Sequence, residues 1–323
     1  MPAAPDHLHL VRDLDGISAT RQSRAAAARA GLLHRVARGA YINAATWSTL
    51  TARERYVMTV HAIGATRRSH QVLSNESAAA IHGLPLIGIP RTVHLSVPTT
   101  ASRPSNERIT THAARLRESD IVEVEGLRVT SLIRTVVDLA AVAPFASAVA
   151  VVDAAILVDR WGRHQPMTTR TQLLEQWAAM QPLRAHSRAR TAIDFGEDRS
   201  ESPLESVSRV SMWVLGAPAP RLQAIHRDDE GDIGYSDFYW PEHRAIGEAD
   251  GDSKYLDPGL RGTKTAEQVI LDEKHREDRL RAITTSFTRW RWEQAANPQR
   301  LRPKLEQLGL PLGKRWPITH RDE

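Results

Sequence analysis

The segment 233–255 restricts the fold most, because acidic residues interrupt a pattern that otherwise indicates strand, turn and strand. It reads IGYSDFYWPEHRAIGEADGDSKY. Its acids include Asp237, Glu248, Asp250 and Asp252. An ionised carboxylate removed from water is costly unless it is paired or bound to a metal. The segment therefore predicts either a metal-binding centre on paired strands or a solvated loop edge.

Strand periodicity favours the metal-binding centre. Side chains alternate along a strand, so Glu248 and Asp250 point to one face. Asp237 lies on the preceding strand, which can pair with this one through the turn at 241–244 and bring three carboxylates together. Oxygen ligands of this kind suit Mg²⁺ or Mn²⁺, whereas without a metal the cluster would raise its own pKa values. Lys254 follows closely and is a candidate for orienting water or stabilising charge on a phosphate.

Composition sets the class of protein. The 323 residues suit two or three domains, and a hydrophobic content of 41% is enough for packed cores. The absence of cysteine excludes disulfides, thiolate zinc sites and cysteine nucleophiles, and it suits a cytoplasmic protein. A formal charge of +5 and a pI near 9.8 favour an anionic partner such as nucleic acid. We expect no membrane span, because no run of about 20 apolar residues occurs.

An arginine-rich first domain, 1–48, has the outline of a winged helix. Ser18 is a plausible helix cap, Gly31 is a plausible stop, and a hairpin with a basic turn at Arg38–Gly39 follows. Arginine binds phosphate and guanine through two acceptors at once, so this domain predicts DNA binding, although a charged helix and hairpin without DNA contact is the alternative. The candidate DNA-binding residues are Arg21, Arg24, Arg29, His34, Arg35 and Arg38.

An α/β domain is expected at 49–157, followed by a helical connector at 158–198. In the α/β domain, helices are predicted at 52–65, at 74–84 and from Ser131 onward. Its strands are predicted at 91–98, 108–116 and 121–130. The scattered histidines of this domain indicate no chemistry.

The last domain, 199–300, carries the acidic segment and precedes a tail at 301–323. A helix is predicted from Ser202 to Gly216, with Glu205 near its start. The expected strands are 221–227, 233–240, 245–250 and 287–292, with a charged helix at 265–283 before the last one. The whole chain is therefore predicted to be α/β (α+β), with a mixed sheet flanked by helices in the last domain.

Residues 202–292 resemble the restriction-endonuclease-like PD-(D/E)XK fold, and more closely its VSR-like branch, DUF559. The resemblance implies a Mg²⁺-dependent endonuclease with Asp237 and Glu248 as ligands and Glu205 as an outer ligand or base. Asp250 stands where the parent motif has lysine, and it becomes a ligand or a water-orienting group. The form E-x-D-G with a later basic residue occurs in this branch, and 248-EADGDSK-254 fits it.

The front of the chain resembles the AbiEi-type antitoxins of type IV toxin–antitoxin systems. The match rests on 10–42, 74–84 and 129–140, and Arg38-Gly39-Ala40-Tyr41 fits the R-G-x-Y ending of the family's winged helix. It implies a DNA-binding autorepressor with a possible cognate toxin as partner. Such a protein would carry the nuclease-like domain in an inactive form.

Three hypotheses therefore remain open at the level of sequence. The first is a DNA-binding, metal-dependent endonuclease. The second is an AbiEi-like repressor or antitoxin whose last domain is silent. The third is a structural carboxylate–arginine network without metal, in which Arg244, Lys254 and Arg276 neutralise the acids.

Overall fold

The structure is a computed structural model that describes residues 9–10, 26–66, 71–100, 105–182, 185–250 and 266–318. These residues form two compact units. The first comprises Met1–Ala143 and Thr168–Arg190, and the second comprises Pro144–Met167 and Thr191–Glu323. The borders fall inside the predicted connector and α/β domain, so each unit collects segments that the sequence assigned to different domains.

The first unit begins with a small sheet in the order β1-β3-β2. Its strands are β1 (His9–Leu10), β2 (Leu33–Ala37) and β3 (Ala40–Asn43). The predicted hairpin is confirmed, with antiparallel pairing and Gly39 at φ +82° in its turn. Helices α2 (Ala44–Thr49) and α3 (Ala52–Ala65) follow, and Thr51 caps α3 together with Glu54 in a capping box.

A mixed five-stranded sheet in the order β6-β5-β4-β8-β7 forms the rest of the first unit with its helices. The strands are β4 (Val72–Leu73), β5 (Val93–Val97), β6 (Ile109–Ala113), β7 (Ile121–Val124) and β8 (Leu127–Thr130). The helices are α4 (Asn75–Ile81), α5 (Leu132–Val142) and α7 (Arg170–Ala179). Ser131 caps α5 through the N–H of Arg134, as its position predicted.

The second unit contains the acidic segment in a four-stranded sheet of order β12-β11-β10-β9. The strands are β9 (Arg221–Asp228), β10 (Gly231–Trp240), β11 (Ala245–Ala249) and β12 (Ser286–Trp290). The helices are α6 (Phe145–Ile156), α9 (Pro203–Leu215), α11 (Ala266–Ile283), α12 (Trp292–Ala295) and α13 (Pro298–Gln307). Helix α8 (His186–Phe195) contains the border at which the first unit ends with Arg190 and the second resumes with Thr191.

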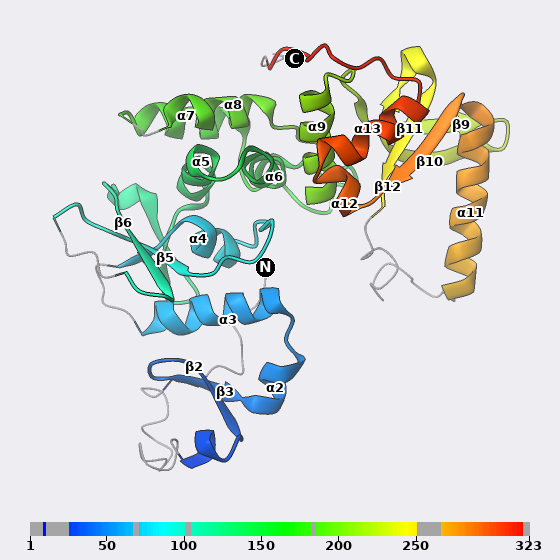
Figure 1. Cartoon of the computed structure of the whole chain (residues 1–323). Coiled ribbons are helices and arrows are strands. Elements are labelled where there is room, and N and C mark those ends of the chain that lie inside the picture. The colour runs from blue at the N-terminus through cyan, green and yellow to red at the C-terminus, as the bar shows by residue number, and fades with distance from the viewer. Residues whose placement is uncertain are drawn as a thin grey trace. The chain divides into compact units, whose positions relative to one another are not determined.

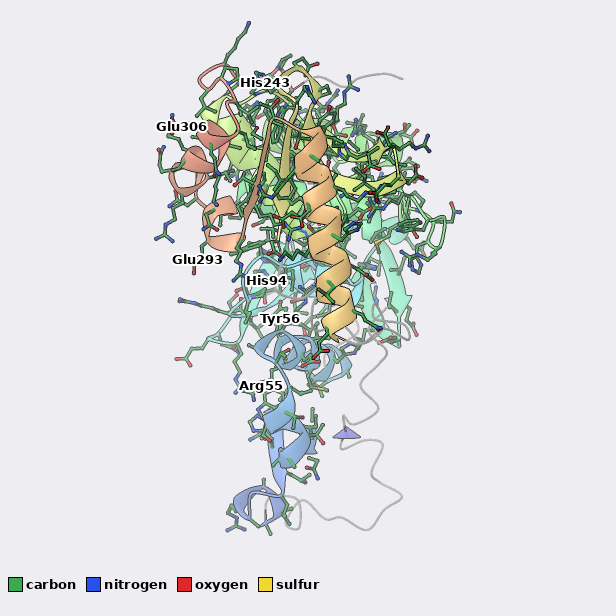
Figure 2. The ribbon with its side chains drawn as sticks, turned by 90° about the vertical axis from the view of Figure 1, so that its right-hand side faces the viewer. Arg55, Tyr56, His94, His243, Glu293 and Glu306 are labelled. Carbon is green, nitrogen blue, oxygen red and sulfur yellow. The ribbon has the colours of Figure 1, made fainter. Side chains whose placement is uncertain are left out.

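Helices α9 and α11 cover opposite faces of this sheet (Figure 1). On the α9 face, Trp290 stacks on Phe238 at 5.3 Å and donates its indole N–H to Ser208 of α9. On the other face, Ile246 and Leu280 belong to one buried cluster, and Figure 2 looks onto α11 lying across the strands there. The arrangement follows from alternation along β11, where apolar and acidic side chains share the α11 face.

The α+β prediction is confirmed by these mixed sheets and helices. The predicted helices and strands of the last domain are all present, with ends within a few residues of the expected ones. Among the described helices, none is both long enough and apolar enough to cross a membrane.

Candidate active site

The candidate active site lies where strands β10 and β11 part. Their antiparallel ladder ends at the pair Phe238–Gly247, and beyond it β11 continues in parallel pairing with β12 alone. Asp237 and Glu248 are the next residues after that last pair. The carboxylate Oδ2 of Asp237 accepts the backbone N–H of Ala249 at 2.8 Å, so a side chain satisfies an amide group that the ladder no longer pairs.

Glu205 reaches Asp237 from the first turn of α9. Ser202 caps this helix through the N–H of Glu205, and its hydroxyl also donates to Glu205 Oε1 at 2.7 Å. The other oxygen, Oε2, accepts the amide of Gln223 at 3.0 Å, and the same Nε2 lies 3.3 Å from Asp237 Oδ1. One amide thus bridges two buried carboxyl groups from different elements.

Burial and the neighbouring charge together raise the pKa of Glu205 to about 8. Desolvation contributes most and the repulsion from Asp237 comes second, while hydrogen bonds from Ser202, Glu201 and Gln223 partly oppose both. The residue is only 3% exposed, so water cannot screen the interaction. Glu205 therefore holds its proton at neutral pH.

Gln223 takes an unusual backbone conformation to make this bridge. It lies in β9 opposite Asp237, between the pairs Ala224–Ser236 and Leu222–Phe238, and has φ +49°. A left-handed conformation is disfavoured for a residue with a side chain and costs on the order of 1 kcal/mol. Such strain is typical of functional sites, and here it aims the glutamine amide at the two acids.

Glu248 is held by two arginines. Arg276 of α11 donates from Nη2 to both carboxylate oxygens, at 2.8 and 3.0 Å, and Arg289 of β12 lies 3.0 Å from Oε2. Burial nevertheless raises the pKa of Glu248, with Arg276 acting against the shift and Asp237 adding to it. The carboxylate is thus buried, paired, and still repelled by its acidic neighbour.

The arginines extend this contact into a wider network. Arg276 also donates to Glu273 at 2.9 Å, and Arg289 binds Glu273 and lies 3.3 Å from Glu277. Arg289 Nε is buried without a hydrogen-bond partner among the described residues. A purely structural network would be expected to satisfy such a donor. The polar cluster at the strand split is therefore not completely satisfied.

The structure brings three of the five predicted catalytic residues together: Glu205, Asp237 and Glu248. Asp250 directly follows β11 and is half-buried, with its backbone N–H bonded to Trp290. Lys254 lies outside the described residues. Across the described ranges, no group of three or more histidine, aspartate or glutamate side chains is arranged to hold a metal ion.

The predicted network of basic partners is found in part. Arg276 neutralises Glu248 as that hypothesis required, whereas Arg244 donates to the carbonyl of Ile283. Arg289 and Gln223 were not foreseen. Arg289 comes beside Glu248 only because β11 and β12 pair in parallel with these two residues in register, which no short-range pattern encodes.

The candidate DNA-binding residues belong to the first unit. Arg29, Arg35 and Arg38 are exposed, the last two on β2 and in the hairpin turn. The His34 ring is half-buried and stacks on Trp47 at 4.3 Å between centroids. The pKa of His34 is lowered by burial and by the positive charges of Arg108 and Arg55. Arg21 and Arg24 lie outside the described residues.

Comparison with known proteins gives two similar mycobacterial sequences. They are the uncharacterized proteins MT2308 and Rv2248 of Mycobacterium tuberculosis, from strains CDC 1551 / Oshkosh and ATCC 25618 / H37Rv. Each is 26% identical over 225 residues, covering 64% of this chain and 77% of the relative. No protein-family model matches the chain. Because both relatives are uncharacterized, this similarity indicates no activity for the chain.

Proposed function

We propose that this protein is a DNA-binding, metal-dependent endonuclease whose catalytic centre is the strand split of the second unit. The observation that carries the proposal is the convergence of Glu205, Asp237 and Glu248 from α9, β10 and β11. Three buried acids with a proton retained on one of them are expensive for a fold to maintain. Strongly perturbed carboxyl groups of this kind concentrate at functional sites.

The carboxylate groups of the site are the type of ligand that a divalent cation requires. Asp237 and Glu248 supply carboxylate oxygens, the ligands that Mg²⁺ and Mn²⁺ prefer, with Asp250 as a third candidate. The mutual repulsion that raises the pKa of Glu205 is relieved by positive charge placed between the acids. A bound cation supplies Lewis-acid chemistry, because it polarises water and offsets the charge of a phosphate.

The remaining residues of the site move or hold protons and orient groups. Glu205 keeps a proton near neutral pH and can exchange it with water that approaches the acids, which fits a general acid–base role. Gln223 fixes the carboxyl groups of Glu205 and Asp237 relative to each other. Arg276 and Arg289 bring positive charge beside Glu248, a task that the parent motif gives to the lysine replaced here by Asp250.

We assign DNA binding to the hairpin formed by β2 and β3 of the first unit, which we call the winged hairpin. Its exposed Arg35 and Arg38 offer planar, bidentate donors that match phosphate and guanine. The formal charge of +5 favours the same partner. A DNA substrate also agrees with a cytoplasmic location.

Cleavage of supercoiled plasmid tests the proposal directly. Purified protein is incubated with Mg²⁺, Mn²⁺ or EDTA, and nicked and linear forms are quantified. We expect metal-dependent cleavage that the Asp237→Ala/Glu248→Ala double variant reduces by at least about 100-fold. Asp232→Ala, which removes an exposed acid of the same strand, should cleave as the wild type does. A wild-type protein that binds but does not cleave duplex, mismatched or single-stranded DNA rejects the endonuclease.

The second candidate is an AbiEi-like repressor or antitoxin with an inactive nuclease-like domain, acting with or without a cognate toxin. The ion pairs of Glu248 with Arg276 and Arg289 favour it, because they already neutralise this acid. It requires specific binding to the protein's own promoter without cleavage. It also requires that Glu248→Gln weaken the fold while leaving promoter affinity unchanged.

A further inference from the structure

A loop near the strand split carries an exposed tryptophan. Residues 158–164 follow α6 in the second unit, and the Trp161 side chain is 58% exposed. A large aromatic side chain exposed to water is a typical feature of a binding surface. The catalytic roles proposed for Glu205, Asp237 and Glu248 do not involve this tryptophan.

The loop is held in shape by one carboxylate. Asp159 accepts the backbone N–H groups of Trp161, Arg163 and His164, at 2.9, 2.9 and 3.1 Å. These hydrogen bonds lower the pKa of Asp159, so it stays ionised as the loop's anchor. The backbone that carries Trp161 is therefore held by Asp159, which limits the backbone entropy lost when a ligand binds there.

Arginines flank the tryptophan ring. The guanidinium of Arg160 lies 5.3 Å from the Trp161 centroid and 4.3 Å over the ring of Tyr235, and that of Arg163 lies 5.9 Å from Trp161. Tyr235 meets the Trp161 ring edge-on, at 5.9 Å between centroids. An exposed aromatic ring with guanidinium groups over it matches a nucleobase with its adjoining phosphate.

The loop is connected to the acids by direct contacts. Arg160 pairs with Glu201 at 3.0 Å and donates to Gln223, whose amide bridges Glu205 and Asp237. Glu201 and Trp161 also line one cavity of about 310 Å³, together with Arg163, His164 and Met167. This volume lies at the lower end of the range for small-ligand pockets. A group bound on Trp161 is therefore next to the proposed catalytic centre.

We propose that Trp161 is a stacking platform for an unpaired nucleobase, which makes DNA with a single-stranded or disrupted segment the substrate class of this site. A base inside an intact duplex keeps both faces stacked on its neighbours and cannot reach the ring. This inference rests on the proposed function for its ligand class. Its test measures binding without metal, so it can fail or succeed independently of cleavage.

The experiment compares binding of a fluorescein-labelled oligothymidylate and a blunt duplex, each of about 20 nucleotides per strand, in EDTA. The Trp161→Ala variant should bind the oligothymidylate about tenfold more weakly and the duplex unchanged. Trp161→Phe should retain most of the affinity because it keeps an aromatic face. Trp292→Ala removes a second exposed tryptophan, 40% exposed on α12, and should bind both DNAs as the wild type does.

Two results would contradict the proposal that Trp161 stacks on a nucleobase. One is wild-type affinity of Trp161→Ala for the oligothymidylate. The other is equal weakening of both DNAs that Trp161→Phe does not restore, which would assign the loop to general packing or to a protein partner. Cleavage of plasmid, mismatched and single-stranded DNA by the same preparations, with Mg²⁺ or Mn²⁺, separates the two proposals. Trp161-dependent binding without cleavage rejects the endonuclease alone, and cleavage without a Trp161 effect rejects the platform alone.

Discussion

At the scale of single residues, Glu205 depends most directly on its surroundings. Its two oxygens accept hydrogen bonds from Ser202, Glu201 and Gln223. The side-chain amide of Gln223 also donates to Asp237. In water the carboxyl group would titrate near 4.5, whereas in this site its pKa is about 8. The difference makes the stability of the second unit depend on pH.

The Glu205→Gln variant should therefore be more stable than the wild type at alkaline pH. Between about pH 4.5 and 8 the folded state keeps a proton that the unfolded state releases, so wild-type stability falls as pH rises through this window. The glutamine has no proton to lose. We expect an advantage of about 4 kcal/mol at pH 8 that vanishes near pH 4.5.

Urea unfolding at a series of pH values measures this difference. Glu293→Gln serves as the control, because that side chain is 81% exposed on α12 (labelled in Figure 2). It should follow the wild-type curve at every pH. A constant offset of Glu205→Gln across the whole range would show that Glu205 does not hold a proton in the folded state.

At the scale of elements, α9 is positioned by both of its ends. Ser202 begins the helix and orients Glu205, and Gly216 ends it with φ +68°. The chain returns to this end from the C-terminal side, where Gly313 N–H donates to Leu215 and Lys314 N–H donates to Gly216. A side-chain carbon at Gly216 would lie 2.4 Å from the backbone nitrogen of Lys314. The C-terminal end of α9 thus depends on close backbone contact.

Gly216→Ala should destabilise the protein more than Gly309→Ala. Both glycines are left-handed, with φ +68° and +72°, but a side-chain carbon at Gly309 would meet nothing within 4 Å. Gly309→Ala carries only the conformational penalty of about 1 kcal/mol. Gly216→Ala adds a backbone clash, for about 2–4 kcal/mol in total. Thermal unfolding compares them, and equal losses would mean that the contact with Lys314 is not made.

At the scale of the whole molecule, the residues proposed for DNA binding and those proposed for catalysis belong to separate units. The winged hairpin and its exposed arginines belong to the first unit, and the acids belong to the second. Neither unit is continuous in sequence, since the chain leaves the first at Ala143 and returns to it at Thr168. Affinity for duplex DNA and chemistry at phosphate are therefore expected to respond to different substitutions.

The Arg35→Ala/Arg38→Ala variant tests this separation through the salt dependence of duplex binding. Each phosphate contact adds about one to the slope of log K against log salt concentration, so the double variant should reduce the slope by about two. Arg227→Ala/Arg300→Ala removes two exposed arginines of the second unit and should leave it unchanged. Equal slopes for the wild type and the Arg35/Arg38 variant would remove these residues from the DNA interface.

Local chemistry explains how much of this molecule was predictable. The hairpin after Leu32, helix α3 and the caps at Ser131 and Ser202 all follow from periodicity and from capping side chains that act over three or four residues. Domain borders were harder to place, because α7 contacts α5 across a long sequence interval and so belongs to the first unit. Compactness depends on such distant contacts, which composition does not encode.

The sequence by itself determined the α+β class, the strand-turn-strand segment and the set of acids, because alternation and turn chemistry are local properties. The tertiary structure decided how those acids are treated. Only the separation of β10 from β11, the left-handed Gln223 and the parallel register of β12 bring Glu205 to Asp237 and Arg289 to Glu248. Burial and neighbouring charge then set their ionisation, and both are properties of the assembled fold.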